Sequence, residues 1–263
     1  MRASVITTVY NRDPRVLENM LASVRGNDLS GTEVVIVDDG STLYEGETIW
    51  TSRPPLFSDS MLRWSRIDTK ADRPDTYQID GYNNPAYAWN RALDAAQGDI
   101  IIVVGSDCIL QSRTLKAARQ CGKAVWMCGV VDIDSGAQYL GPQRIAPFGW
   151  VMAWNRKEIG DIRWDENYLR GMAFDDNDMT ARLGLAAKQI HLDFSITAFH
   201  QSHASTAYSD GLYGHGINER YTREKWGGIP WSGEKDDPLR VAMARQGNLH
   251  ILQVERKDAP VPA

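Results

Sequence analysis

Residues 4–41 read SVITTVYNRDPRVLENMLASVRGNDLSGTEVVIVDDGS. Residues 4–9 are rich in β-branched side chains, which is typical of a buried strand. Pro14 suits the first turn of a helix, in which apolar residues recur at helical spacing until Gly26 ends it. A second apolar run, residues 33–41, leads into an acidic turn. The stretch therefore predicts a strand, a helix and a second strand, the building block of a parallel sheet.

The same alternation continues to Asp107. We predict a strand at residues 61–67, a helix at 84–97 and an apolar strand, DIIIVVGSD, at 99–107. Continuous apolar strands separated by helices predict an α/β fold whose mostly parallel sheet is flanked by helices. In such sheets a ligand binds beyond the carboxyl ends of the strands. Polar residues stand at three of those ends: Tyr10 and Asn11, Asp38 and Asp39, and Asp107.

The second half of the chain is less regular. We predict strands at residues 125–134, 148–154, 188–192 and 196–200, and helices at 175–187, 218–226 and 237–246. The polar, glycine-containing segment 202–216 is predicted to be a loop that closes over a ligand.

Composition narrows the function classes. Of 263 residues, 43% are hydrophobic and 24% charged, which excludes a disordered chain, a collagen-like repeat and a coiled coil. The net charge of −5 argues against non-specific binding to nucleic acid. Three cysteines without a CxxC pair predict neither a disulfide scaffold nor a zinc site, which favours the reducing cytoplasm. The longest clean apolar run, Ile100–Val104, is too short to span a bilayer, so we expect no transmembrane segment.

Four polar motifs can carry chemistry. VDDGS places Asp38 at a strand exit, where a carboxylate can accept hydrogen bonds from a base or a ribose. GSDC places Asp107 where it can bind a divalent cation on a diphosphate. FDDND, residues 174–178, offers a general base at a helix start, and FHQSH offers His200 as a metal ligand. Taken singly, each motif also fits a turn, a helix cap, acidic residues at a helix start or a packed histidine.

In this order, the motifs resemble family 2 glycosyltransferases with the GT-A fold. Residues 4–41 are similar to the opening of those enzymes, and NPAYAWNRALDAAQGDIIIVVGSDCIL, residues 84–110, to the block that ends at their DxD motif. FGWVMAWNRKEIGDIRWDENYLRGMAFDDNDMTARLG, residues 148–184, resembles their acceptor-side block. FHQSH resembles their late histidine segment, and NERYTREKWG, residues 218–227, their C-terminal helix. The resemblance covers roughly residues 4–227.

The resemblance implies roles for particular residues. Donor binding is implied for six of them: Thr8, Tyr10, Asp38, Asp39, Asn90 and Ser106. Asp107 and His200 would hold Mn²⁺ or Mg²⁺. Asp176 would be the catalytic base, and Trp150 and Asp175 would contact the donor sugar or the acceptor. One departure concerns the metal, because Gly105 stands where the family has the first Asp of its DxD motif.

The function implied is that of an inverting glycosyltransferase, which moves a sugar from a nucleotide-sugar donor to an acceptor hydroxyl. UDP-sugars are the commonest donors in the family. Within a single catalytic domain, residues 1–110 would form the nucleotide-sugar half, 111–232 the acceptor half, and 233–263 a C-terminal helix and tail.

Two other functions stay open. Gly105 suits a nucleotide-sugar-binding protein without catalysis. A sugar nucleotidyltransferase shares the acidic strand ends, but it normally has a glycine-rich phosphate loop where this chain reads VYNRDP. The acceptor can be a glycan, a protein or a hydroxymethylated DNA base. Four basic residues near one predicted helix can face a polyanion or only solvent: Arg113, Lys116, Arg119 and Lys123.

Overall fold

The computed structural model describes residues 1–10, 12–41, 61–67, 85–140, 150–168, 174–201, 212–230 and 250–254. The strands are β1 (Ala3–Val9), β2 (Thr32–Asp38), β3 (Leu62–Arg66), β4 (Ile100–Val104), β5 (Cys108–Ile109), β6 (Val125–Asp132), β7 (Gln138–Leu140), β8 (Val151–Asn155), β9 (Gln189–His200) and β10 (His250–Val254). The helices are α1 (Pro14–Arg25), α2 (Pro85–Ala95), α3 (Thr114–Ala118), α4 (Arg156–Ile159), α5 (Asp175–Ala187) and α6 (Leu212–Trp226).

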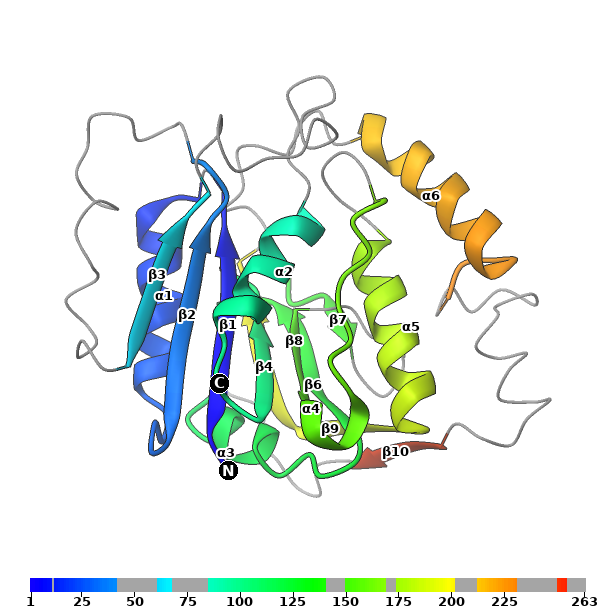
Figure 1. Cartoon of the computed structure of the whole chain (residues 1–263). Helices are drawn as coiled ribbons and strands as arrows, with labels where there is room; N and C mark the ends of the chain where they lie inside the picture. Colours follow the sequence, from blue (N-terminus) through cyan, green and yellow to red (C-terminus); the bar gives the residue numbers. More distant parts are fainter. Residues whose placement is uncertain are drawn as a thin grey trace.

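The described strands form one sheet in the order β10-β9-β6-β8-β4-β1-β2-β3, with β5 paired to β9 and β7 paired to β6. Neighbours along this order are parallel except at β8, which is antiparallel to both β4 and β6. Because β8 reverses direction between them, β4 and β6 run the same way. The carboxyl ends of β1, β2, β4, β6 and β9 therefore meet at one edge, the upper edge in Figure 1.

Alternate residues of each strand pack on opposite faces of the sheet. Ile101 and Val103 belong to a cluster with α2 and α5, whereas Ile100 and Ile102 belong to a cluster with α1 and α3. Figure 1 shows α2 in front of the sheet and α1 behind it. A strand buried on both faces needs apolar residues at every position, and this explains the unbroken run in β4.

The fold class predicted from the sequence is confirmed. The first predicted strand, the helix that begins at Pro14 and the helix Asp175–Ala187 all form, the last with the predicted bounds. Asp13 caps α1 by accepting a hydrogen bond from the backbone N–H of Arg15, and the helix is followed by Gly26. The three cysteines, Cys108, Cys121 and Cys128, are free thiols, and all three are buried. None of the helices that the structure describes is long and apolar enough to cross a bilayer.

Several predictions differ from the structure. The two short strands predicted at 188–192 and 196–200 are one strand, β9. The predicted loop 202–216 is wrong for residues 212–216, which belong to the first turns of α6. The C-terminal segment contains the strand β10, paired in parallel with β9, where we expected only a helix and a tail. The predicted helix at 237–246 and the remainder of the loop lie outside the described residues.

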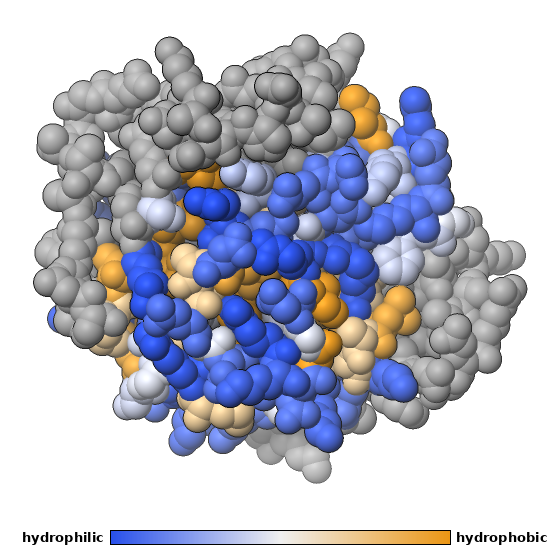
Figure 2. Space-filling view, in the orientation of Figure 1, coloured by the Kyte–Doolittle hydropathy of each residue, from blue (hydrophilic) through white to orange (hydrophobic). Residues whose placement is uncertain are grey.

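Figure 2 shows the same face as a surface. Hydrophilic residues cover most of its central part, and hydrophobic residues lie between them. Among the described residues, the exposed large hydrophobic side chains are Met1, Ile133 and Ile217, which are far apart in the chain. Single exposed apolar residues are normal for a globular protein and do not indicate a docking surface.

Candidate active site

The sheet brings the sequence-predicted polar residues to one edge. β1 pairs in parallel with both β2 and β4, so three candidate residues lie near the carboxyl ends of adjacent strands. Asp38 is the last residue of β2, Tyr10 directly follows β1, and Asp107 lies in the turn after β4. β5 pairs antiparallel with the end of β9, which sets Cys108 opposite His200. The backbone N–H of Gln201 donates to the carbonyl oxygen of Asp107 at 2.9 Å. These pairings join residues from both halves of the chain at the place where α/β sheets bind ligands.

Asp107 lies at the centre of this edge. Its Oδ2 is 3.3 Å from Nε2 of His200 and 3.0 Å from Nη2 of Arg12. Arg12 also donates from Nε to Oγ of Ser106 at 3.2 Å. Arg12, Ser106 and Asp107 are buried, so the ion pair is shielded from solvent. Asp107 and His200, predicted to act together, are therefore in contact, with a guanidinium on the same oxygen.

The environment keeps the Asp107 carboxylate ionised. Burial acts to raise its pKa, but the hydrogen bond from His200 and the charge of Arg12 outweigh burial and hold the pKa below its ordinary value. The site thus holds a stable negative charge that is compensated locally.

Trp150 and Gly105 complete this group. The indole of Trp150 stacks on the His200 ring, with centroids 4.9 Å apart and planes 29° apart. The backbone N–H of Gly105 donates to the carbonyl oxygen of Trp150 at 2.7 Å. A Cβ at Gly105 would lie 3.0 Å from Oδ1 of Asp107 and 3.2 Å from Sγ of Cys108. Side-chain space at position 105 is therefore already limited by its neighbours.

Asp38 and Asp39 are buried at the end of β2. Oδ1 of Asp38 accepts hydrogen bonds from the backbone N–H and the hydroxyl of Ser41, at 2.9 and 2.7 Å. The backbone N–H of Asp39 donates to the carbonyl oxygen of Val9, which ties this turn to β1. Thr8 lies opposite Val37 in the same strand pair. Asp38 thus shapes its own turn, and its contact with a nucleotide stays a prediction.

Asn90 holds a loop of the second half. From α2, its Nδ2 donates to the carbonyl oxygen of Trp164 at 3.0 Å and to Oε1 of Glu166 at 2.6 Å. Its Oδ1 accepts from the backbone N–H of Trp164 at 2.8 Å. The Trp164 ring also stacks on Trp89, at 5.2 Å between centroids. These contacts give Asn90 a structural task, and its predicted contact with a diphosphate stays untested.

The acidic residues at the start of α5 lie in two different environments. Asp178 is fully buried: its Oδ2 contacts Arg182 at 2.6 Å, and its Oδ1 accepts from the indole N–H of Trp226 at 2.9 Å. Asp175 and Asp176 are half-buried. Burial, and then the charge of Asp176, raise the pKa of Asp175 to about 7.

The first turn of α5 lies at the same edge as Asp107. α5 ends at Ala187 and is followed by β9, with Lys188 in a left-handed conformation between them. β9 runs in the direction of β6, which is also the direction of β4 and β1. Because the end of α5 leads directly into the beginning of β9, the beginning of α5 lies near the carboxyl ends of the parallel strands. The fold therefore brings Asp175 and Asp176 to the edge that holds the other candidate residues.

One family model and several solved structures are similar to this chain. Residues 4–49 match the family model described as Glycosyl transferase family 2. The match covers the amino-terminal part of the chain, and the fold as a whole is similar to that of GT-A glycosyltransferase structures. The matched segment contains Thr8, Tyr10, Asp38 and Asp39. No curated protein sequence matches the chain significantly.

Solved glycosyltransferase structures share the fold. S. aureus TarS 1-349 in complex with UDP-GlcNAc is 19% identical, with a TM-score of 0.56 over 85% of this chain and 67% of that one. The mannosyltransferase PcManGT from Pyrobaculum calidifontis, in complex with GDP-Man and Mn²⁺, is 15% identical, with a TM-score of 0.55 over 92% of this chain and 64% of that one. Another S. aureus TarS structure is matched at 17% identity and a TM-score of 0.53, over 85% of this chain but 40% of that one.

The residues present in this glycosyltransferase fold do not fit a divalent cation as they are arranged. Gly105 supplies no carboxylate, and Oδ2 of Asp107 already contacts both Arg12 and His200. A metal ion on that oxygen would lie beside a guanidinium, which repels it. Across the described ranges, no three His, Cys, Asp or Glu side chains are grouped so that they could hold a metal.

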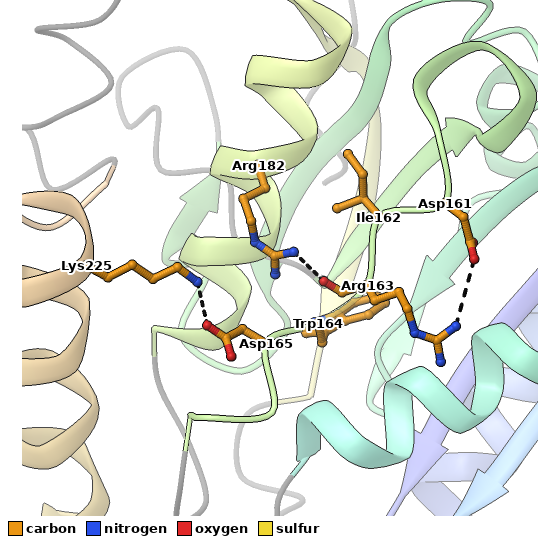
Figure 3. Close-up of a pocket in the computed structure, with 7 residues that line it drawn as sticks. All are labelled: Asp161, Ile162, Arg163, Trp164, Asp165, Arg182 and Lys225. Carbon is orange, nitrogen blue, oxygen red and sulfur yellow. Dashed lines mark hydrogen bonds and ion pairs between the residues drawn. The ribbon is translucent and has the colours of Figure 1, made fainter.

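A pocket of about 540 Å³ lies elsewhere, between α5, α6 and the segment 161–165 (Figure 3). Its basic side chains already have acidic partners. Arg163 contacts Asp94 at 2.8 Å, Lys225 contacts Asp165 at 2.5 Å, and Arg182 contacts Asp178. None of the residues predicted to act in catalysis lines this pocket, so we regard it as a junction that fixes α6 on the domain.

Arg12 contacts this site but is not among the residues predicted from the sequence. Two signals in the sequence point to it. It follows the first strand, where phosphate-binding loops begin in many α/β folds. In addition, Gly105 leaves the DxD-like turn with only one carboxylate to bind a metal ion. A basic side chain nearby could supply the positive charge in place of that metal ion.

Proposed function

We propose that this protein transfers a sugar from a nucleotide-sugar donor to an acceptor hydroxyl, with inversion at the anomeric carbon. The observation that supports this most strongly is the convergence of Tyr10, Asp38, Asp107 and His200 at one sheet edge. Ligands of α/β sheets bind at that edge, and the family match covers the first two of these residues.

A UDP-sugar is the donor that we propose first. A TarS structure contains UDP-GlcNAc, whereas PcManGT contains GDP-Man, so a guanine nucleotide is the alternative. In this proposal, Thr8, Tyr10 and Asp38 bind the base and ribose, with Asp39 supporting the turn. Ser106 and Asn90 lie on the diphosphate side. Residues 1–110 would then form the donor half, and residues 111–232 the acceptor half.

The proposed chemistry needs one base. Asp176 accepts the proton of the acceptor hydroxyl, whose oxygen attacks the anomeric carbon as the bond from that carbon to the diphosphate oxygen breaks. The electron pair of the broken bond leaves with the nucleoside diphosphate. An attack in line with the leaving group inverts the anomeric centre. Trp150 and Asp175 contact the sugar or the acceptor in this proposal.

A glycan is the acceptor class that the surface charge favours over DNA. Two of the four basic residues beside α3 are paired: Arg119 contacts Asp28 at 2.7 Å, and Lys123 lies 3.9 Å from Glu158. Less unpaired positive charge is then left to attract a polyanion. Protein and hydroxymethylated DNA acceptors are the alternatives. The compartment that we propose is the cytoplasm, because the cysteines are unpaired thiols.

The test combines binding with turnover. A panel of UDP-, GDP- and dTDP-sugars is screened by thermal shift, since a ligand that binds the folded state raises the melting temperature. The stabilising donor is then incubated with candidate acceptors, and release of nucleoside diphosphate is measured. Stabilisation without release from any acceptor would favour the non-catalytic binding protein, which Gly105 also suits. Release of pyrophosphate from a nucleoside triphosphate and a sugar phosphate would indicate a nucleotidyltransferase.

A further inference from the structure

The Arg12 guanidinium is held in place by two buried partners. Nε donates to Ser106 and Nη2 contacts Asp107, so both partners come from the turn that follows β4. Arg12 itself follows β1, and its side chain is only 8% exposed. A planar guanidinium fixed through two of its nitrogens has a fixed orientation. The third nitrogen is therefore also fixed.

That third nitrogen, Nη1, has no hydrogen-bond partner among the described residues, although it is buried. Buried polar groups nearly always have a partner, and leaving a charged donor unsatisfied is costly. An anionic oxygen is the partner that such a group favours. The unsatisfied Nη1 is thus an observation independent of the ion pair, and it indicates a ligand.

The charges at the site also indicate that Arg12 can bind an anionic ligand. Asp107 alone would repel a diphosphate, and a divalent cation is one way to cancel that repulsion. Arg12 already cancels it, because a guanidinium is charged at every physiological pH. Like a metal ion, Arg12 can bind a carboxylate on one side and an anionic oxygen on the other.

Gly105 supports this alternative to a metal. A carboxylate at position 105 would be the second acidic ligand of a cation, and the chain has no side chain there. Even a Cβ would lie 3.0 Å from Oδ1 of Asp107 and 3.2 Å from Sγ of Cys108. A side chain at position 105 would therefore have to shift the Asp107 carboxylate or the Cys108 thiol.

We propose that Arg12 binds the donor diphosphate through Nη1 and supplies the positive charge that a divalent cation would otherwise supply. Donor binding then needs no added metal. As the bond from the anomeric carbon to the diphosphate oxygen breaks, the negative charge that develops on the diphosphate is stabilised by the same guanidinium. The inference rests on the proposed function, because it describes how that site holds its donor.

The test measures binding of UDP, GDP and uridine by calorimetry, on the full chain treated with EDTA and again with added Mn²⁺. We expect the chain to bind UDP or GDP with affinities that agree within about threefold with and without Mn²⁺. In EDTA, Arg12→Gln should weaken nucleoside diphosphate binding by about ten- to a hundredfold, the usual effect of losing a charge-assisted hydrogen bond. It should leave binding of uridine, which has no phosphate, unchanged if UDP is the ligand.

Two further variants control for folding and for charge. Arg15→Gln removes an exposed arginine of the same segment and should leave all affinities unchanged. Ser106→Ala keeps the ion pair but removes the hydrogen bond to Nε, and should weaken UDP or GDP binding less than Arg12→Gln does. The comparison of the parent with and without metal needs no variant, so it stands even if Arg12→Gln does not fold.

The outcomes separate this inference from the proposed function. Binding of UDP or GDP only with Mn²⁺, or equal affinity in Arg12→Gln and the parent, would overturn the role of Arg12 and leave the proposed function in place. Failure of the parent to bind any nucleoside diphosphate, with or without Mn²⁺, would overturn both.

Discussion

Lys225 on α6 contacts the buried carboxylate of Asp178 on α5 at 2.6 Å. Asp178 also contacts Arg182 and Trp226, so one carboxylate joins two helices and compensates two cations. This is a structural role, and it separates Asp178 from the two acidic residues that precede it in the same helix.

Asp178→Asn should destabilise the fold. The substitution keeps the size of the side chain but leaves the cations of Arg182 and Lys225 without their shared partner. Breaking a buried ion pair typically costs about 3–5 kcal/mol. Urea denaturation measures the loss. Asp161→Asn, at an exposed carboxylate 3.8 Å from Arg163, is the control and should change the free energy of unfolding by less than about 1 kcal/mol. Similar losses in both variants would contradict the structural role of Asp178.

Asp176→Asn should remove the proposed base. Loss of a general base typically lowers the rate by about 10²–10⁴-fold. The measurement is kcat with a saturating donor, together with the donor Kd, which should stay unchanged. Asp178→Asn, assayed at a temperature where it is folded, should retain most of its kcat. If Asp176→Asn works at the parent rate while folded Asp178→Asn is inactive, the base has been assigned to the wrong residue.

Asp175 should make stability depend on pH. Its pKa is raised to about 7 in the folded protein from an ordinary value of 3.8. At a pH between these two values, Asp175 is protonated in the folded protein but ionised in the unfolded chain. The contribution of Asp175 to the free energy of unfolding therefore falls as the pH rises from about 4 to 7. Asp175→Asn should remove this contribution. The stability of the variant relative to the parent should therefore be greater at pH 8 than at pH 5. Parallel pH profiles for the variant and the parent in urea denaturation would refute the shift.

Asp38→Ala should weaken UDP or GDP binding about tenfold or more, as expected for losing a hydrogen bond to a charged group. The carboxylate also orders its turn through Ser41, and this could weaken binding indirectly. Ser41→Ala removes one of those turn contacts and keeps the carboxylate. Calorimetry should show a loss of less than about threefold for Ser41→Ala. Equal losses in the two variants would mean that the turn, and not a contact with the nucleotide, explains the effect.

Asn90→Ala should release the loop that begins at Trp164. Its amide satisfies two backbone groups of Trp164, so the expected loss of stability is about 1–3 kcal/mol. Asn167→Ala, an exposed amide of the same loop, should change stability by less than about 0.5 kcal/mol. Donor affinity decides between the two roles of Asn90. An unchanged Kd supports a purely structural role, and a tenfold weaker Kd at unchanged fold would support the predicted contact with the diphosphate.

The sheet was predictable where local pattern and tertiary packing agree. The apolar run Ile100–Val104 can only be a strand covered on both faces, and the helix at Asp175–Ala187 has acidic residues at its start. The sequence predicts two strands in place of β9, because the polar residues Asp193 and Ser195 interrupt its run of apolar residues. Oδ1 of Asp193 accepts hydrogen bonds from the backbone N–H and the hydroxyl of Ser195, near the register shift at Cys128 and Gly129 of β6. A local irregularity can thus lie within one strand.

At the candidate site, one contact was predictable from the sequence and another was not. Asp107 and His200 were expected to act together, and the pairing of β5 with β9 brings them into contact. The contact of Arg12 with Asp107 depends on the neighbouring positions of β1 and β4, a tertiary relationship that no local pattern encodes. Likewise, the pairing of β10 with β9 joins distant segments.

The reversed strand β8 has a consequence for synthesis of the chain on the ribosome. β4 is complete at Val104, but its outer edge is covered only when Val151–Asn155 has emerged and inserted between β4 and β6. Until then, the nascent chain presents an unpaired edge made entirely of isoleucine and valine, which is prone to pair with another chain. Fragments that end before Asn155 should therefore aggregate, and the shortest dependable expression fragment must extend beyond β8.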